Sequence, residues 1–340
     1  GTINMDETKS VAYETISEKL KDQLGYKVGI VTSVNLNHAT PAAFYAHQAS
    51  RNDYYEIGVE MVESGFDYFA GGNLKSIKGK DGKQEDLYEL AKKAGYDVIL
   101  TQKEAEQVKA GAGKTIIVDE HLADSDSMLY ELDRNDSQLG LAEYVEKGIE
   151  VLDNDKGFFM MVEGGKIDWA CHANDAGSTI GDTLALDDAV KEAIEFYNDH
   201  PDETLILVTG DHETGGLTIG FAGTDYDTFL TNLKNQKISY AKYDSDYVSN
   251  YKKNNIPFDT VLTDIQTLFG LVAPANAAQA KDEKLVLTDY ELGRIKAAYD
   301  KTMAGSSEEL TQEEYVLYGT YEPLSVTITH ILNNKSGVNF

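Results

Sequence analysis

Residues 158–174 read FFMMVEGGKIDWACHAN and contain the strongest pattern in the chain. The apolar run over residues 158–162 predicts a buried strand that delivers Glu163 at its carboxyl end, and the two glycines that follow permit a tight turn. Asp168 and His172 are four residues apart, so one helical turn would aim both side chains at a single point. A carboxylate oxygen and an imidazole nitrogen form a sound partial shell for zinc, although an isolated pair of this kind is more often an ordinary surface contact.

Residues 205–216, LILVTGDHETGG, repeat the arrangement of an apolar run that ends in polar groups. We predict a strand over residues 204–209, after which Asp211 and His212 follow and glycines let the backbone approach a ligand closely. Burying such polar groups without partners is costly, and a divalent cation is the simplest partner. By itself, an Asp-His dipeptide at a strand end is weak evidence for a metal.

Residues 37–51, NHATPAAFYAHQASR, contain a threonine-proline step and an arginine. Thr40 before Pro41 suits the N-cap and the first position of a helix, which is a purely structural role. Arg51 is expected about three turns farther along the same helix. An arginine there suits bidentate recognition of phosphate, although a surface arginine is the commoner role.

The first two thirds of the chain alternate short apolar runs with amphipathic stretches, as strands and helices do in a largely parallel sheet. The sequence therefore predicts an α/β fold in which helices flank a largely parallel central sheet. Ligand sites of open α/β sheets lie beyond the carboxyl ends of the strands, which is where the three segments above are placed. Besides the strands already named, we expect strands at 27–32, 68–70, 98–101 and 115–118, and helices at 9–24, 86–94, 140–152 and 184–197.

The character of the sequence changes after residue 222, where tyrosines recur and the alternation of strands and helices fades. We interpret residues 1–222 as the α/β core, residues 223–322 as a mostly helical insertion, and residues 323–340 as a truncated return to the core. Tyrosine combines apolar area with a polar tip, so the insertion is a candidate partner surface, although its tyrosines equally suit packing within the insertion.

Fifty-eight acidic and 30 basic residues give the 340-residue chain a formal charge of -28. Nucleic acids and anionic membranes need a basic face, so neither is expected as the main partner. This field would repel a phosphate substrate unless bound cations or an arginine supplied local positive charge. The single cysteine, Cys171, excludes an intrachain disulfide framework, and no apolar run reaches the roughly 18 residues of a membrane span.

Taken together, in order and spacing, the three segments resemble the alkaline phosphatase family. The resemblance extends over about residues 1–220, and its supporting stretches are residues 1–6, 70–72, 130–134 and 175–176. It implies the family's fold and the hydrolysis of small phosphate monoesters at a site that holds two zinc ions and one magnesium ion. Two zinc ions can clamp the attacking and leaving oxygens of a phosphoryl transfer, and magnesium prefers oxygen ligands.

The resemblance also assigns ligands residue by residue: Asp168 and His172 for the first zinc, Asp211 and His212 for the second, and Thr40 and Glu163 for magnesium. Arg51 matches the arginine that holds two phosphate oxygens, and it is the catalytic residue that this chain contains. His38 and Trp169 occupy positions beside the site where the family varies, and we assign them to substrate binding.

The family's pattern includes a bridging aspartate and a nucleophilic serine before the position of Gly1, and a last zinc histidine after that of Phe340. We therefore expect residues 1–340 alone to be inactive. The family implies an extracellular or periplasmic protein and is compatible with a homodimer, while residues 1–8 carry no signal-peptide pattern. Two alternatives stay open: a phosphodiesterase, phosphonate hydrolase or sulfatase of the same superfamily, and a non-catalytic module that binds metal or partners.

Overall fold

The computed structural model describes residues 1–305 and 310–340, which form two compact units. Each unit combines segments that lie far apart in the sequence. Unit 1 comprises Gly1–Leu129, Arg134–Gly165 and Thr183–Val208, and unit 2 comprises Tyr130–Asp133, Lys166–Asp182 and Thr209–Phe340. The boundaries of core and insertion that we expect at residues 222 and 322 stay predictions.

Unit 1 is built on a five-stranded parallel sheet in the order β3-β4-β2-β1-β5. The strands are β1 (Lys27–Asn35), β2 (Tyr68–Gly72), β3 (Asp97–Ile99), β4 (Thr115–Val118) and β5 (Phe158–Glu163). Their register pairs Thr32 of β1 with Glu163 of β5, which places the expected magnesium ligand at the carboxyl end of the sheet. The predicted α/β fold with a largely parallel sheet is confirmed.

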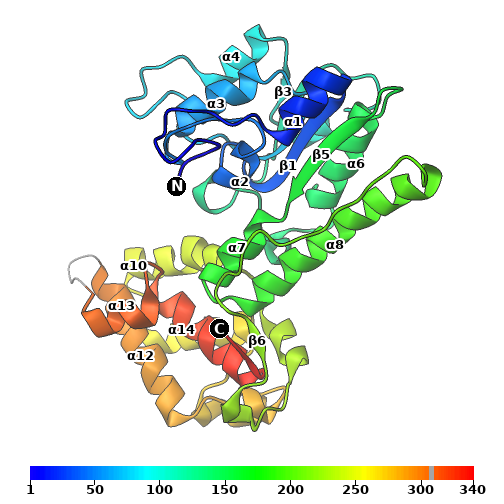
Figure 1. The fold of residues 1–340 in the computed structure, drawn as a ribbon. Coiled ribbons are helices and arrows are strands. Elements are labelled where there is room, and N and C mark those ends of the chain that lie inside the picture. The colour runs from blue at the N-terminus through cyan, green and yellow to red at the C-terminus, as the bar shows by residue number, and fades with distance from the viewer. Residues whose placement is uncertain (306–309) are drawn as a thin grey trace. The chain divides into compact units, whose positions relative to one another are not determined.

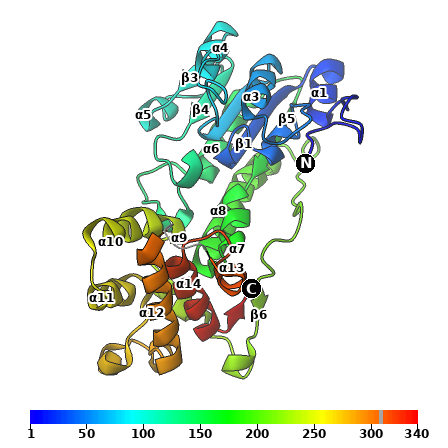
Figure 2. The same ribbon diagram turned by 90° about the vertical axis from the view of Figure 1, so that its left-hand side faces the viewer.

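Helices cover both faces of this sheet, because successive strand residues point to opposite sides. Val28 and Ile30 of β1 pack with α3 and α4, whereas Val31 packs with α6 and the part of α8 that lies in unit 1. Helices α3 and α6 accordingly lie on opposite sides of the strands (Figure 1; Figure 2). The helices are α1 (Ile16–Lys19), α2 (Ala39–Ala42), α3 (Tyr54–Glu63), α4 (Leu87–Lys93), α5 (Gln102–Ala105), α6 (Leu141–Leu152) and α8 (Ala176–Asp199).

The N-terminal helix is shorter than the sequence predicts. Instead of a helix over residues 9–24, helical structure begins only at Ile16. The Asp6 carboxylate accepts hydrogen bonds from the backbone N–H groups of Ser10 and Val11, at 2.8 and 2.9 Å. Such side-chain bonds offer the backbone an alternative to a helix, and here they close a turn.

The strand predicted over residues 204–209 is wrong, because the structure leaves this segment as coil. Leu205, Leu207 and Val208 are 81%, 80% and 65% exposed. A strand forms only where a neighbour completes its ladder of hydrogen bonds. Among the residues that the structure describes, β5 ends the sheet and pairs with β1 alone, and residues 204–209 do not pair with its open outer edge.

Unit 2 is mostly helical and is organised around α14 (Pro323–Lys335), most of whose residues are buried. Leu324, Ile328 and Ile331 of α14 pack in one cluster with apolar residues of α11 and α12. A short antiparallel pair, β6 (Thr218–Ile219) with β7 (Val338–Asn339), closes the unit. Its other helices are α7 (Gly165–His172), α9 (Tyr240–Lys242), α10 (Ser249–Asn254), α11 (Phe258–Phe269), α12 (Asp289–Ala304) and α13 (Gln312–Tyr318).

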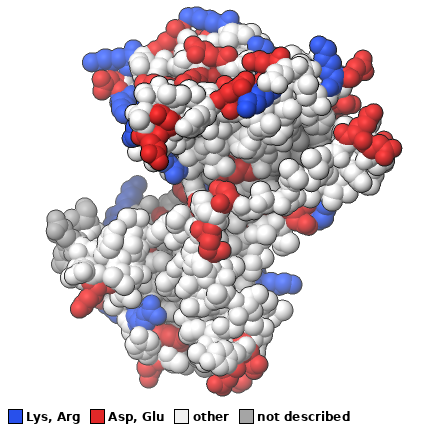
Figure 3. Space-filling view, viewed as in Figure 1, with Lys and Arg blue, Asp and Glu red and all other residues white. Residues whose placement is uncertain are grey.

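The surfaces of both units carry many carboxylates. Acidic side chains are spread over the face of the molecule in Figure 3, with basic ones interspersed among them. None of the helices in residues 1–305 and 310–340 is long and apolar enough to cross a membrane. Because an acidic surface repels anions, positively charged groups at the site itself would have to attract an anionic substrate.

Candidate metal centre

Both predicted zinc pairs lie in unit 2. Asp168 and His172 sit one turn apart on α7, as the four-residue spacing predicts, with 3.5 Å between Asp168 Oδ1 and His172 Nε2. Asp211 and His212 lie in the loop before β6, with 3.5 Å between Asp211 Oδ2 and His212 Nε2. Each pair thus points one carboxylate oxygen and one imidazole Nε2 toward each other.

The separation of 3.5 Å within each pair has a simple geometric meaning. A charge-assisted hydrogen bond between the same atoms would be about 2.7–2.9 Å long. Zinc bonds to nitrogen and oxygen are about 2.0–2.2 Å, so two ligands of a tetrahedral zinc stand about 3.3–3.6 Å apart. Both pairs therefore have the spacing of one edge of a zinc shell.

The surroundings of His212 determine which of its ring nitrogens carries the proton. Nδ1 lies 3.1 Å from the backbone carbonyl oxygen of Glu213 and 3.1 Å from Thr214 Oγ1. A carbonyl oxygen only accepts hydrogen bonds, so Nδ1 carries a hydrogen in this arrangement. Nε2 faces the Asp211 carboxylate at 3.5 Å, and an imidazole nitrogen and a carboxylate oxygen are both ligands that zinc accepts.

Thr214 connects the two pairs. Its hydroxyl donates to Asp168 Oδ1 at 2.6 Å, while its oxygen accepts from His212 Nδ1. Thr214 is not among the predicted site residues; its place two residues after His212 is the only signal in the sequence that marks it. Such groups behind metal ligands fix their orientation.

Gly215 explains how the loop reaches α7. Its φ of 73° lies in the left-handed region, and a Cβ at this position would overlap the carbonyl oxygen of Cys171. The backbone of the loop therefore packs directly on α7, next to Thr214. This close approach, rather than the end of a strand, is what brings Asp211 and His212 to the other pair.

The pairs supply only part of a complete metal shell. In the described part of the chain, no three His, Cys, Asp or Glu side chains gather to hold one ion. The side chains of His172, Asp211 and His212 are 58–64% exposed, so an ion can reach them from solvent. Each pair accordingly offers two of the four ligands that zinc usually takes.

Cys171 directly precedes His172 in the sequence. It is buried on α7, 3.7 Å from Thr179 Oγ1, and burial raises the pKa of its thiol. A thiolate is the form that binds zinc or attacks a substrate, so the burial of Cys171 disfavours both roles.

The predicted magnesium ligands lie in unit 1. Glu163 Oε2 accepts a hydrogen bond of 2.5 Å from the hydroxyl of Thr32, which is fully buried on the neighbouring strand. Thr40 lies on α2, which packs against β1 and β5. A Cβ on Gly165 would lie 3.0 Å from the Glu163 carboxyl carbon, so this glycine leaves room around the carboxylate. Carboxylate and hydroxyl oxygens fit magnesium.

The structure corrects two expectations about the segment that contains Thr40. His38, not Thr40, is the N-cap of α2, so Thr40 lies within the first turn. The helix ends at Ala42, and Arg51 lies in an exposed turn before α3 rather than on the same helix. The backbone N–H of Arg51 donates to the carbonyl of Gly1 at 2.9 Å, which fixes the turn and leaves the guanidinium on the surface.

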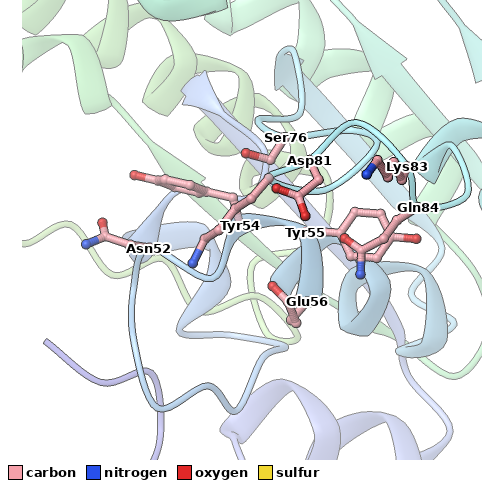
Figure 4. A pocket seen from close by; sticks show the side chains of 9 residues that line it. Asn52, Tyr54, Tyr55, Glu56, Ser76, Asp81, Lys83 and Gln84 are labelled. Carbon is pink, nitrogen blue, oxygen red and sulfur yellow. The ribbon is translucent and has the colours of Figure 1, made fainter.

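A separate cavity of about 250 Å³ lies in unit 1 between the start of α3 and the loop of residues 76–84 (Figure 4). It begins at Asn52, the residue after Arg51, and Glu56 and Asp81 give it carboxylates while Lys83 gives it an amine. The predicted metal ligands, Arg51 and His38 do not line it. The cavity is therefore distinct from the candidate metal centre.

The family model for alkaline phosphatase matches residues 1–268 of this chain. The chain belongs to the alkaline phosphatase family. It is 29% identical to Alkaline phosphatase 4 of Bacillus subtilis over 96% of its own length, 32% identical to Alkaline phosphatase 3 of the same bacterium over 66%, and 32% identical to the human tissue-nonspecific isozyme over 55%. It spans 68% of the first relative and less than half of the other two.

Solved structures of alkaline phosphatases also superpose on this chain. The cold-active enzyme of the psychrophile Shewanella sp. superposes with a TM-score of 0.75 at 25% identity, over all of this chain and 71% of that chain. A variant of the enzyme of the Antarctic bacterium TAB5, with Mg bound in its M3 site, gives a TM-score of 0.56 at 32% identity. The match covers 64% of this chain and 61% of that chain.

Proposed function

We propose that this alkaline phosphatase family member hydrolyses phosphate monoesters, with Asp168, His172, Asp211 and His212 as ligands of two zinc ions and Thr40 with Glu163 as ligands of one magnesium ion. The observation that carries the proposal is the equal 3.5 Å spacing of the two Asp–His pairs, joined through Thr214. The family match over residues 1–268 supports the monoesterase chemistry.

The residues of this chain prepare the centre in three ways. Thr214 holds the Asp168 carboxylate on one side and keeps the Nδ1 proton of His212 engaged on the other. Thr32 does the same for Glu163. Bound zinc would lower the pKa of an attacking oxygen and stabilise the charge of a leaving oxygen.

Arg51 would supply local positive charge for a phosphate substrate of this acidic chain. Its planar guanidinium offers two parallel N–H donors, which match two oxygens of a phosphoryl group. We assign His38 and Trp169 to the surroundings of the substrate. The net charge of -28 makes these short-range groups necessary, because the long-range field repels the substrate.

The proposal is tested in the full-length protein by removing one ligand from each pair. His172→Ala and Asp211→Ala should each lower bound zinc, measured by metal analysis, and remove most monoester hydrolysis. Thr218→Val, a change at an exposed threonine of β6, should leave both unchanged. Full zinc content and full activity in both ligand variants would refute the assignment.

The same assay separates the alternative functions. A phosphate diester and a sulfate ester are offered beside the monoester, and preference for either one over the monoester would support the phosphodiesterase or sulfatase alternative. Zinc binding without hydrolysis of any ester would support a non-catalytic metal-binding module. Secretion and homodimer formation, which the family suggests, are tested by cell fractionation and light scattering.

A further inference from the structure

Lys166 is a fully buried lysine in unit 2, two residues before Asp168. Its Nζ lies 3.7 Å from the centre of the Tyr130 ring and 4.9 Å from that of the Trp169 ring. An ammonium over aromatic faces is attracted by their electron density, and the attraction is strongest where water is excluded. The lysine thus sits in an aromatic cage made by two separate segments of the chain.

An acidic residue of α8, in the same segment of unit 2 as Lys166, lies beside this cage. Asp182 of α8 is only 6% exposed, and the backbone N–H of Glu131 donates to its Oδ2 at 3.4 Å. Burial raises the pKa of Asp182, and the Lys166 ammonium is the main influence that lowers it again. The net pKa of Asp182 stays well above its ordinary value, so Lys166 offsets only part of the cost of ionising this buried carboxyl group.

The position of the cage on α7 relates it to the metal ligands. With about 100° of rotation per residue, Lys166 and Trp169 leave one side of the helix while Asp168 and His172 leave another. A helix rotates as a rigid body, so anchoring the first side fixes the direction of the second. Trp169 also packs in a cluster with Tyr130 and Tyr240, which strengthens the anchor.

We propose that Lys166 is a positioning residue: its ammonium, held between Tyr130 and Trp169 and beside Asp182, sets the orientation of α7 in which Asp168 and His172 bind zinc. The inference rests on the proposed function, because it concerns the same zinc ligands. Groups behind metal ligands typically change metal affinity by about 10- to 100-fold when they are removed. Lys166→Met should therefore weaken zinc binding by a factor in that range.

Trp169 is the only tryptophan in the chain, so its fluorescence reports on the cage directly. The metal-free protein is excited where tyrosine does not absorb, quenched with acrylamide, and then titrated with zinc. In Lys166→Met we expect a shifted emission maximum, faster quenching and weaker zinc binding. Lys166→Arg, which keeps a cation that stacks on aromatic rings, should restore most of the affinity. Lys92→Met, at a lysine that is 53% exposed, is the matched control.

A double variant distinguishes two roles of Lys166: stabilising the fold alone, and orienting the zinc ligands of α7. Lys166→Met alone leaves Asp182 buried without its cation and can unfold the unit, whereas Lys166→Met with Asp182→Asn removes both charges. The folded double variant should still bind zinc about 10- to 100-fold more weakly than wild type. Thermal unfolding of each variant, recorded without metal, establishes that the protein compared is folded.

Three outcomes would overturn the inference: zinc affinity within about twofold of wild type in the double variant, unchanged Trp169 emission and quenching in Lys166→Met, or an equal loss of affinity in Lys166→Arg. Failure of the wild-type protein to bind zinc at all would instead overturn the proposed function. The two failures are therefore distinguishable in one set of titrations.

Discussion

The hydroxyl of Thr214 is the best single test of the candidate zinc centre, because it touches both pairs. Thr214→Val keeps a similar shape and removes the 2.6 Å hydrogen bond to Asp168 Oδ1 and one of the two acceptors beside His212 Nδ1. A hydrogen bond to a charged group contributes about 1.5–3 kcal/mol. Asp168 is 34% exposed, which favours the lower end of this range. A loss of about 1.5 kcal/mol weakens zinc binding about tenfold.

The assay for this variant is competition for zinc between the protein and a chromogenic chelator, followed at fixed pH. Thr214→Ser keeps the hydroxyl and should bind zinc within about twofold of wild type. Thr218→Val removes a hydroxyl that donates to the Asn339 carbonyl at 3.2 Å, away from the pairs, and should leave affinity unchanged. Wild-type zinc affinity in Thr214→Val would refute the reasoning, because the hydroxyl could then not be what holds the two pairs together.

Three further predictions concern other parts of the molecule. Arg51→Ala should weaken inhibition by free phosphate and lower monoester kcat/KM, but less than loss of a zinc ligand does; unchanged values for both would show that Arg51 is not the phosphate clamp. Gly215→Ala should destabilise the protein by more than about 1 kcal/mol in urea unfolding and also weaken zinc binding, because its φ of 73° and the Cys171 carbonyl leave no room for a Cβ. Burial raises the pKa of Asp119, so the folded state binds that proton more tightly than the unfolded state, and stability should fall as pH rises above the ordinary value of 3.8. Asp119→Asn should flatten this slope in urea unfolding measured at a series of pH values; an unaltered slope would contradict it.

Local sequence predicts the elements whose structure depends on local forces. Residues 115–118 are all β-branched and form β4 with the expected bounds. The spacing of Asp168 and His172 needs only one helical turn, and α7 provides it. The turn closed by Asp6 is also local, but its side-chain bonds to Ser10 and Val11 compete with an amphipathic pattern that favoured a helix.

Contacts between residues that lie far apart in the chain could not be predicted from the sequence. The apolar run over residues 204–209 has strand composition, yet a strand also needs a partner, and in the structure this run does not pair with the open edge of β5. Thr214 and Asp168 are 46 residues apart, so no motif reports their hydrogen bond. The cage around Lys166 likewise joins two separate segments, and a lysine read from sequence alone is expected on the surface.

The position of α14 near the end of the given sequence determines which parts of the chain can fold first during translation. Its residues Ile328 and Ile331 complete the apolar cluster, while His330 Nε2 lies 2.7 Å from Asn174 Oδ1 and Asn333 donates to the Asn174 carbonyl at 2.7 Å. Asn174 ends the segment that begins with α7. The ribosome must therefore translate beyond Asn333 before the far end of α7 is anchored, whereas the sheet of unit 1 has all its strands by Glu163. A nascent chain arrested between these points would have a folded sheet and an immature zinc helix.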